Sequence, residues 1–156
     1  LADQGCDVVT CHVEGPKVIC ETAVSRDIFV CGYHADQTPV AGDKYLTGAE
    51  WNWANVYTDM VAKTLSGEQI PNFVRGGLAD GFIKMSPLGP AVSDAARAQF
   101  EATKAEIEAG GFAAIKGPLK DNKGNVIAAE GESFVETDVA IESMDYLVEG
   151  VIGSTS

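Results

Sequence analysis

The stretch IFVCGYHADQTPVAGDKYLTGAEWNW, residues 28–53, decides the fold. It begins with an apolar, β-branched run at 28–31, typical of a strand, and then turns polar after Gly32. A second strand-like piece at 45–48 leads into two tryptophans around an asparagine. Ligands of α/β proteins bind at the loops that follow the carboxyl ends of parallel strands. The stretch therefore predicts a small-ligand site beside a parallel sheet.

The residues upstream complete a strand–helix–strand unit. Residues 7–11 form a nearly continuous apolar run, as expected of a strand buried on both faces. Pro16 suits the first position of a helix, which we expect to reach about residue 26. Such units wind right-handed into a parallel sheet. The exit loops 12–15 and 32–37 are therefore expected side by side at one edge.

The downstream half predicts further helices and strands. Asn52 is expected to cap a helix that ends at 66–67, and Ser93 a helix that ends near residue 109. The second helix has an apolar stripe that should be buried, comprising Ala96, Phe100, Thr103 and Ile107. Strands are expected at 82–85, 112–115 and 125–128, with a hairpin-type turn at 121–124. The predicted fold class is α/β, a parallel sheet flanked by helices.

Length and charge exclude some classes of protein. The 156 residues suffice for one domain with a real core. The net charge of −12 argues against a nucleic-acid-binding surface, which needs clustered Lys and Arg. No run approaches 18 apolar residues, so the sequence predicts no membrane span. The chain opens on Leu1, and we expect it to be part of a longer protein.

Four cysteines lie in the first fifth of the chain, at positions 6, 11, 20 and 31. The favoured interpretation is buried free thiols acting as small apolar groups. Cys11-His12 and the Cys31–His34 pair end two neighbouring predicted strands, so four zinc-type ligands could converge. The usual Cys-x-x-Cys spacing is absent, and alternation along a strand points Cys11 and His12 to opposite sides. We therefore predict neither a metal nor a cofactor.

Catalytic signatures are absent from the sequence. There is no G-x-S-x-G motif, and no cysteine lies in a known catalytic motif. The glycine-rich segment 76–81 lacks the Lys-Ser/Thr and the spacing of a phosphate-binding or dinucleotide-binding loop. Asp36 and His34 are the one candidate acid–base pair. The sequence therefore favours ligand binding over catalysis.

The candidate ligand-binding residues lie in the exit loops and around the tryptophans. They are Glu14, Gly15, His34, Asp36, Trp51 and Trp53. The tryptophans, two residues apart around a helix start, are expected to face different ways, with Trp51 a stacking platform and Trp53 part of the core. Asp36 either accepts from a ligand or forms an Asx turn, and the His34 tautomer is open.

Several short motifs, taken together, carry a family resemblance. They are QGCDVV (4–9), GYHADQ (32–37), YLT (45–47), NW (52–53) with Tyr57, GGLADG (76–81), and GPLKDN (117–122) with Gly124. With these motifs the chain resembles the basic membrane protein family, the substrate-binding proteins of ABC transporters. The resemblance implies the two-lobed periplasmic-binding-protein type I fold. Residues 1–156 would be its C-terminal part, mainly the second lobe, with hinge crossings near 48–52 and 128–137.

The resemblance also implies capture of a purine base or nucleoside without catalysis. The implied partners are an ABC permease and the missing N-terminal lobe. The implied location is the periplasm, or a lipoprotein anchored outside the cytoplasmic membrane. An oxidising periplasm would favour pairing of cysteines that lie within reach of one another, and Cys6 with Cys31, near two neighbouring strands, is one candidate pair.

Two departures from the family pattern bear on the ligand. His34 stands where nucleoside-binding members have a ribose-binding aspartate, and Trp51 where they have a lysine; Asp36 and Gln37 are retained. Imidazole cannot accept twice from two hydroxyls, and an added indole favours a bare planar ring. The expected ligand is therefore adenine or a similar free base. The alternatives are an enzyme of nucleobase or nucleoside metabolism, with Asp36 and His34 as acid and base, and a regulatory ligand-binding domain.

Overall fold

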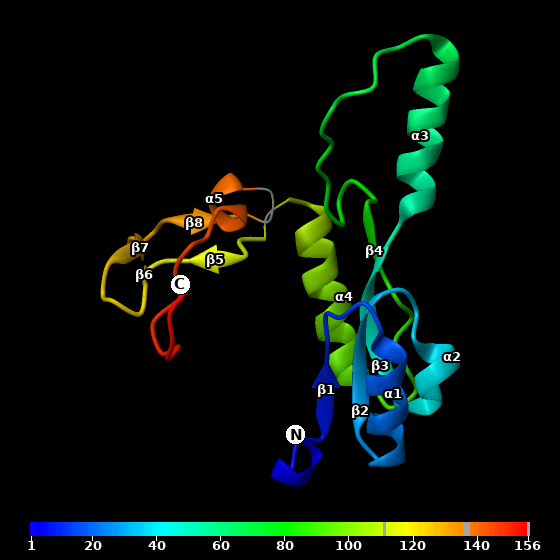
Figure 1. The fold of residues 1–156 in the computed structure, drawn as a ribbon, viewed down its shortest axis with the longest axis vertical. Coiled ribbons are helices and arrows are strands. Elements are labelled where there is room, and N and C mark those ends of the chain that lie inside the picture. The colour runs from blue at the N-terminus through cyan, green and yellow to red at the C-terminus, as the bar shows by residue number, and fades with distance from the viewer. Residues whose placement is uncertain (111, 136–137, 156) are drawn as a thin grey trace. The chain divides into compact units, whose positions relative to one another are not determined.

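The computed structural model describes residues 1–110, 112–135 and 138–155. The chain divides into two compact units, Leu1–Glu108 and Ala109–Ser156, and each is described by itself. Figure 1 labels the α-helices and strands of the first unit, which also contains two short 3-10 helices, η1 and η2. In chain order the elements are η1 (Ala2–Gln4), β1 (Val8–Thr10), α1 (Pro16–Ser25), β2 (Phe29–His34), α2 (Thr38–Ala41), η2 (Gly42–Lys44), β3 (Tyr45–Trp51), α3 (Trp53–Ser66), β4 (Ile83–Met85) and α4 (Asp94–Glu108).

A four-stranded sheet organises the first unit, with strand order β1-β2-β3-β4. β1, β2 and β3 are parallel, and β4 pairs with β3 in the antiparallel direction. This arrangement confirms the predicted strand–helix–strand unit and the α/β class, with a mixed, mostly parallel sheet flanked by helices. β2 and β3 are longer than predicted, because their mutual ladder continues until His34 faces Glu50. Residues 32–34 and 49–51 therefore belong to strands, not loops.

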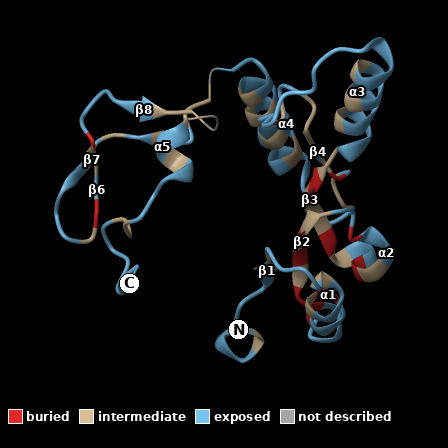
Figure 2. Cartoon of the chain, turned by 45° about the horizontal axis from the view of Figure 1, so that its top comes forward, coloured by how far each residue is buried: buried red, intermediate tan, exposed pale blue. Residues whose placement is uncertain are grey.

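The core of the first unit is small and lies around the two central strands. Buried side chains from α1, α2 and the β2–β3 region pack together, namely Cys20, Ala23, Ile28, Val30, Ala41 and Tyr45. Figure 2 shows the buried residues gathered around β2, β3 and the adjoining helices. The core therefore packs around β2 and β3, the two central strands of the sheet.

Two glycines face each other across β2 and β3 and admit the ring of Tyr45. Gly32 pairs with Gly48. A Cβ at Gly32 would lie 2.7 Å from Tyr45 Oη, and one at Gly48 would lie 2.6 Å from the Gly32 carbonyl oxygen. Such separations are shorter than van der Waals contact, so both positions require glycine for close packing.

A buried polar chain begins at the Tyr45 hydroxyl. Tyr45 Oη lies 2.9 Å from Ser86 Oγ, which donates to Glu50 Oε1 at 2.7 Å. The other Glu50 oxygen pairs with Lys84 Nζ at 2.9 Å. Only 8% of Glu50 is exposed, and a buried carboxylate is tolerated because it is both paired and hydrogen-bonded. This series of polar contacts links β3 to β4 and to Ser86, which follows β4.

The free energy of unfolding is expected to fall in alkaline solution. Burial raises the pKa of the Cys20 thiol, with a smaller contribution from nearby Cys11, and burial also raises the pKa values of Cys31 and Tyr45. Above the ordinary thiol and phenol pKa values the unfolded chain therefore releases protons that the folded chain retains, which favours unfolding. Urea unfolding between about pH 8 and pH 10 should show the decline. Cys20→Ala should make it shallower, whereas a flat profile in the parent would contradict the prediction.

Helix α3 begins where predicted, but Asn52 does not cap it with its side chain. Asn52 occupies the N-cap position, yet its Nδ2 donates to the Gly81 carbonyl at 2.9 Å. The side-chain amide of Asn52 therefore bonds to the loop that carries Gly81 instead of capping α3. This bond links the start of α3 to the loop that precedes β4. Figure 1 shows α3 projecting from the end of β3. Its apolar side chains at every fourth position are exposed, namely Trp53, Tyr57, Val61 and Leu65.

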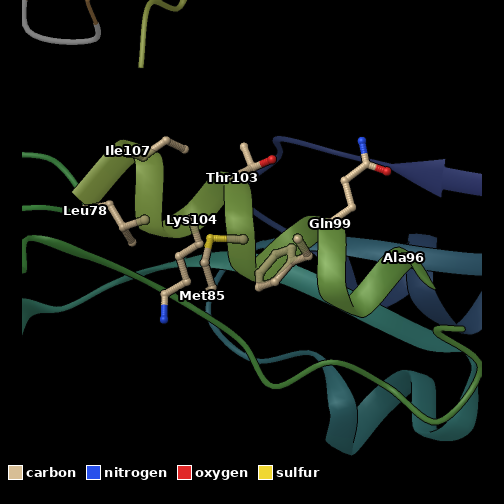
Figure 3. A pocket seen from close by; sticks show the side chains of 8 residues that line it. Leu78, Met85, Ala96, Gln99, Thr103, Lys104 and Ile107 are labelled. Atoms are coloured by element: carbon tan, nitrogen blue, oxygen red, sulfur yellow. The ribbon is translucent and has the colours of Figure 1, made fainter. Parts of the chain in front are cut away.

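The expectation of a buried stripe on α4 is wrong. Ser93 Oγ does accept from the Ala96 amide, so the predicted cap forms. None of the α4 residues is buried, and the stripe instead borders an open hollow of about 360 Å³ with Leu78 and Met85 (Figure 3). The stripe stays half-exposed because no described element of the first unit covers it.

The second unit consists of two short antiparallel ladders and one helical turn. The elements are β5 (Ile115–Lys116), β6 (Leu119–Lys120), β7 (Val126–Ala128), β8 (Ser133–Phe134) and α5 (Val139–Glu142). β6 and β7 form the predicted hairpin around 121–124, with Gly124 at φ 90°. The strand predicted at 112–115 is wrong, because pairing with β8 begins only at Ile115. Of the predicted crossing at 128–137, residues 136 and 137 lie outside the described residues.

All four cysteines are free thiols, so the candidate Cys6–Cys31 pair is not formed. Cys20 is buried, Cys11 and Cys31 are half-buried, and Cys6 is exposed. The prediction of buried thiols therefore holds fully only for Cys20. Among the described residues, no helix combines the length and apolar character required to cross a membrane.

Candidate ligand-binding site

The carboxyl ends of the three parallel strands surround a hollow of about 410 Å³. Its lining comes from β1 and its exit loop, from β2 and from β3, and consists of Thr10, Cys11, His12, Gly32, Tyr33 and Ala49. This volume is within the range of small-ligand pockets. The two exit loops do lie side by side, as the topology predicted, because β1 and β2 are parallel neighbours.

A continuous cluster of aromatic rings runs along this edge of the sheet. The ring of Tyr33 lies 4.2 Å from that of His12 and 4.2 Å from that of His34. Trp51 continues the cluster, 5.7 Å from Tyr33. The rings meet in tilted or edge-to-face geometry, and edge-to-face is an arrangement that aromatic pairs prefer. The arrangement offers planar apolar faces beside the hollow, together with polar ring atoms.

Trp53 is not part of the core, contrary to the prediction. Its side chain is 51% exposed, and its ring lies 5.6 Å from Trp51 and 5.6 Å from Tyr57. The two tryptophan rings meet because β3 runs to Trp51 and the chain turns into α3 at Asn52, so strand alternation does not separate them. Both tryptophans also border a second hollow of about 310 Å³ between α3 and the segment around residues 71–76.

His34 is held by a hydrogen bond and by an uncommon backbone conformation. Trp51 Nε1 donates to His34 Nδ1 at 2.9 Å, and both side chains are half-buried. His34 has φ +73°, in the left-handed region where histidine, asparagine and aspartate are enriched among non-glycine residues. Backbone strain of this kind gathers at functional sites. The structure therefore joins two of the predicted site residues directly.

Asp36 takes the turn-forming alternative. Its Oδ1 accepts from the Thr38 amide at 2.8 Å and from the Thr38 hydroxyl. This Asx-type arrangement closes the loop into α2. Glu14 and Gly15 are exposed in the β1–α1 loop, and neither lines the hollow. Of the predicted site residues, the structure thus brings together His34, Trp51 and Trp53, and leaves the other three apart from that cluster.

Residues His12, Tyr33 and Tyr57 belong to the cluster, although sequence reasoning did not select them. His12 and Tyr33 lie in segments that were interpreted as exit loops, and their position directly after apolar runs was the available signal. Tyr57 lies one helical turn after Trp53, and i, i+4 aromatic residues share a helix face. The spacing of Trp53 and Tyr57 is visible in the sequence, but the same spacing also predicts a helix face packed in the core.

The described side chains provide no assembled metal centre or acid–base pair. Among them, no group of three or more His, Cys, Asp and Glu is placed to hold a metal ion. Asp36 and His34 make their hydrogen bonds to Thr38 and Trp51, respectively, and not to one another. This edge of the sheet presents ring faces and a few polar contacts.

Comparison with known proteins was made by sequence and by fold. No protein-family profile matches the chain. A purine-binding protein from Brucella abortus is 29% identical over 97% of this chain. A protein named as an ABC transporter glucose-binding protein, from Haloferax volcanii, is 26% identical over 98% of it. The chain spans 42% and 36% of the lengths of these two relatives, respectively.

A solved structure titled as a transcriptional activator of the comK gene, from Bacillus halodurans, shares the fold. Its TM-score is 0.65 at 19% identity, over 70% of this chain and 39% of that one. This likeness concerns the fold alone. Over nearly its whole length, the chain is similar in sequence to proteins named for binding purines and for binding glucose in an ABC transporter. The comparisons therefore confirm the resemblance to small-molecule-binding proteins of the ABC-transporter type that the sequence motifs indicated.

Proposed function

We propose that this chain forms part of the substrate-binding component of an ABC transporter and captures a purine base or nucleoside. The observation that carries the proposal is the aromatic cluster beside the hollow at the ends of β1, β2 and β3. A planar heterocycle gains from stacking on such rings by about 0.5–1.5 kcal/mol beyond area burial. The names of the two relatives are consistent with small-molecule capture.

The proposed architecture is a type I periplasmic-binding fold with two lobes. Residues 1–156 supply mainly one lobe, and the other wall of the cleft comes from a further part of the protein. The lobes close around the ligand by a hinge motion, and the closed form is presented to a membrane permease. The protein works outside the cytoplasmic membrane, in the periplasm or as an anchored lipoprotein. No chemical step is required of the site.

Within this proposal we favour a free base such as adenine over its nucleoside. The imidazole of His34 cannot accept hydrogen bonds from two adjacent ribose hydroxyls. Trp51 and Trp53 add ring surface next to it. Asp36, Glu14 and Gly15 stay secondary candidates, since a closing second lobe would bring a ligand against the exposed loops that carry them.

Calorimetry on the full-length protein tests the proposal with adenine, adenosine and glucose. We expect adenine to bind most tightly of the three. Tighter binding of adenosine would reject the preference for a bare base, and tighter binding of glucose would assign the site to sugars, as in the name of the second relative. Chromatography of the same mixtures would reveal a product if the protein were an enzyme. Binding of none of the three would reject purine capture.

A further inference from the structure

The contact between Trp51 and His34 determines which nitrogen of the imidazole carries the proton. The indole nitrogen Nε1 can only donate, and it lies 2.9 Å from His34 Nδ1. Nδ1 must therefore be the unprotonated nitrogen of the neutral ring. A neutral imidazole carries one proton, so that proton is on Nε2. The second nitrogen of His34 is thus a hydrogen-bond donor.

That donor is not used within the described part of the chain. His34 Nε2 has no hydrogen-bond partner there. In the same residues, no side-chain nitrogen or oxygen is both buried and unpartnered, so Nε2 is reached by solvent. His34 also contacts the rings of His12 and Tyr33, which line the hollow. An accessible N–H is therefore available next to the proposed ligand space.

We propose that Trp51 fixes His34 as a hydrogen-bond donor and that this selects planar heterocycles presenting an in-plane lone pair. This inference rests on the proposed function of the site. A ring nitrogen or a ring carbonyl satisfies the Nε2–H group, whereas an amino group or a ring N–H would face it donor to donor. An unmatched pair of this kind costs the ligand its desolvation without a compensating bond.

The surrounding packing keeps the imidazole in this orientation. Tyr33 lies edge-to-face against His34 at 4.2 Å, and His12 does so at 5.3 Å. The backbone at His34 adopts φ +73°, which fixes the direction in which its side chain leaves β2. The ring therefore has one nitrogen bonded to the indole and two neighbouring rings packed in edge-to-face geometry beside it. A donor held in this way loses little side-chain entropy on binding.

The tautomer is measured directly by imidazole nitrogen NMR on the full-length protein near pH 8.5, about two units above the ordinary histidine pKa. We expect the His34 Nδ1 resonance to be that of an unprotonated nitrogen and Nε2 that of a protonated one. The His34 resonances are assigned as those that disappear in a His34→Asn variant, and a His12→Asn variant identifies those of the neighbouring histidine. In Trp51→Phe, which keeps a ring but removes the N–H, the two resonances should move toward averaged values. A protonated Nδ1 in the parent protein would overturn the inference.

Ligand selectivity is tested with adenine and its 1-deaza, 3-deaza and 7-deaza analogues, in which a C–H replaces one ring nitrogen. We expect one analogue to bind about tenfold more weakly than adenine, and this penalty to shrink in Trp51→Phe. Equal binding of all four compounds would overturn the inference while leaving purine capture intact. Binding of none would reject purine capture, and the NMR result would then decide the polarity of His34 alone.

Discussion

Replacing His34 by aspartate is expected to shift the ligand preference toward adenosine relative to adenine by about 10–100-fold. The carboxylate accepts hydrogen bonds and cannot donate, so it matches ribose hydroxyls and no longer matches a ring lone pair. Hydrogen bonds to a charged group contribute about 1.5–3 kcal/mol, which corresponds to this range. Calorimetric Kd values for the two ligands, in parent and variant full-length protein, give the ratio.

The matched control is His34→Asn. Asparagine has nearly the size of aspartate, is neutral and can both donate and accept. Both replacements tolerate the positive φ of +73° at this position, so neither should strain the backbone. The asparagine variant should therefore change the ratio less than the aspartate variant. An unchanged adenosine-to-adenine ratio in His34→Asp would show that this side chain does not contact the ligand.

Replacing Gly48 by alanine is expected to lower the free energy of unfolding by about 1–3 kcal/mol, the usual cost of overpacking. The added methyl group would meet the Tyr45 hydroxyl and would lie 2.6 Å from the Gly32 carbonyl oxygen. The neighbouring backbone belongs to the ladder between β2 and β3 and cannot move without breaking it. Urea unfolding followed by circular dichroism measures the change.

Gly15→Ala is the control for this stability change. Nothing lies within 4 Å of a Cβ at Gly15, and its φ of −118° suits any residue. The control introduces no overpacking and should lose only the preference of an N-cap for glycine over alanine, about 0.5–1 kcal/mol. Equal stability of the two variants would mean that the sheet relaxes around the methyl group at Gly48 and that the close approach is not required.

The strand–helix–strand unit was predictable because its signals are local. An apolar run, Pro16 at the first helical position and a second apolar run lie within 31 residues. In the second unit the hairpin turn at 121–124 was predictable for the same reason, but the shortest strands were not. Two-residue strands such as β5 and β8 are too short to show alternation, so pairing alone defines them. The exposure of the apolar stripe on α4 could not be predicted either. Periodicity predicts that a helix has an apolar face, but not which other element packs against that face.

The sequence predicted the edge of the sheet at which the aromatic cluster lies, but only part of the composition of that cluster. The ends of parallel strands indicated this edge, and His34 and Trp51 lie there. Trp53 was misassigned because helical periodicity places it on an apolar stripe, whereas the stripe itself is exposed. The tautomer of His34 depends on a partner 17 residues away, which no local pattern specifies.

The opposed glycines of β2 and β3 have a consequence for how the site can change during evolution. Gly32 contributes backbone to the wall of the hollow, and Tyr45 packs against the position where its side chain would be. A wall of peptide groups has no rotamers to freeze when a ligand covers it. Packing therefore constrains the shape of this wall more tightly than it constrains the aromatic and polar residues around it. Related proteins with this wall should acquire new ligands through a few side chains at its rim, with the sheet unchanged.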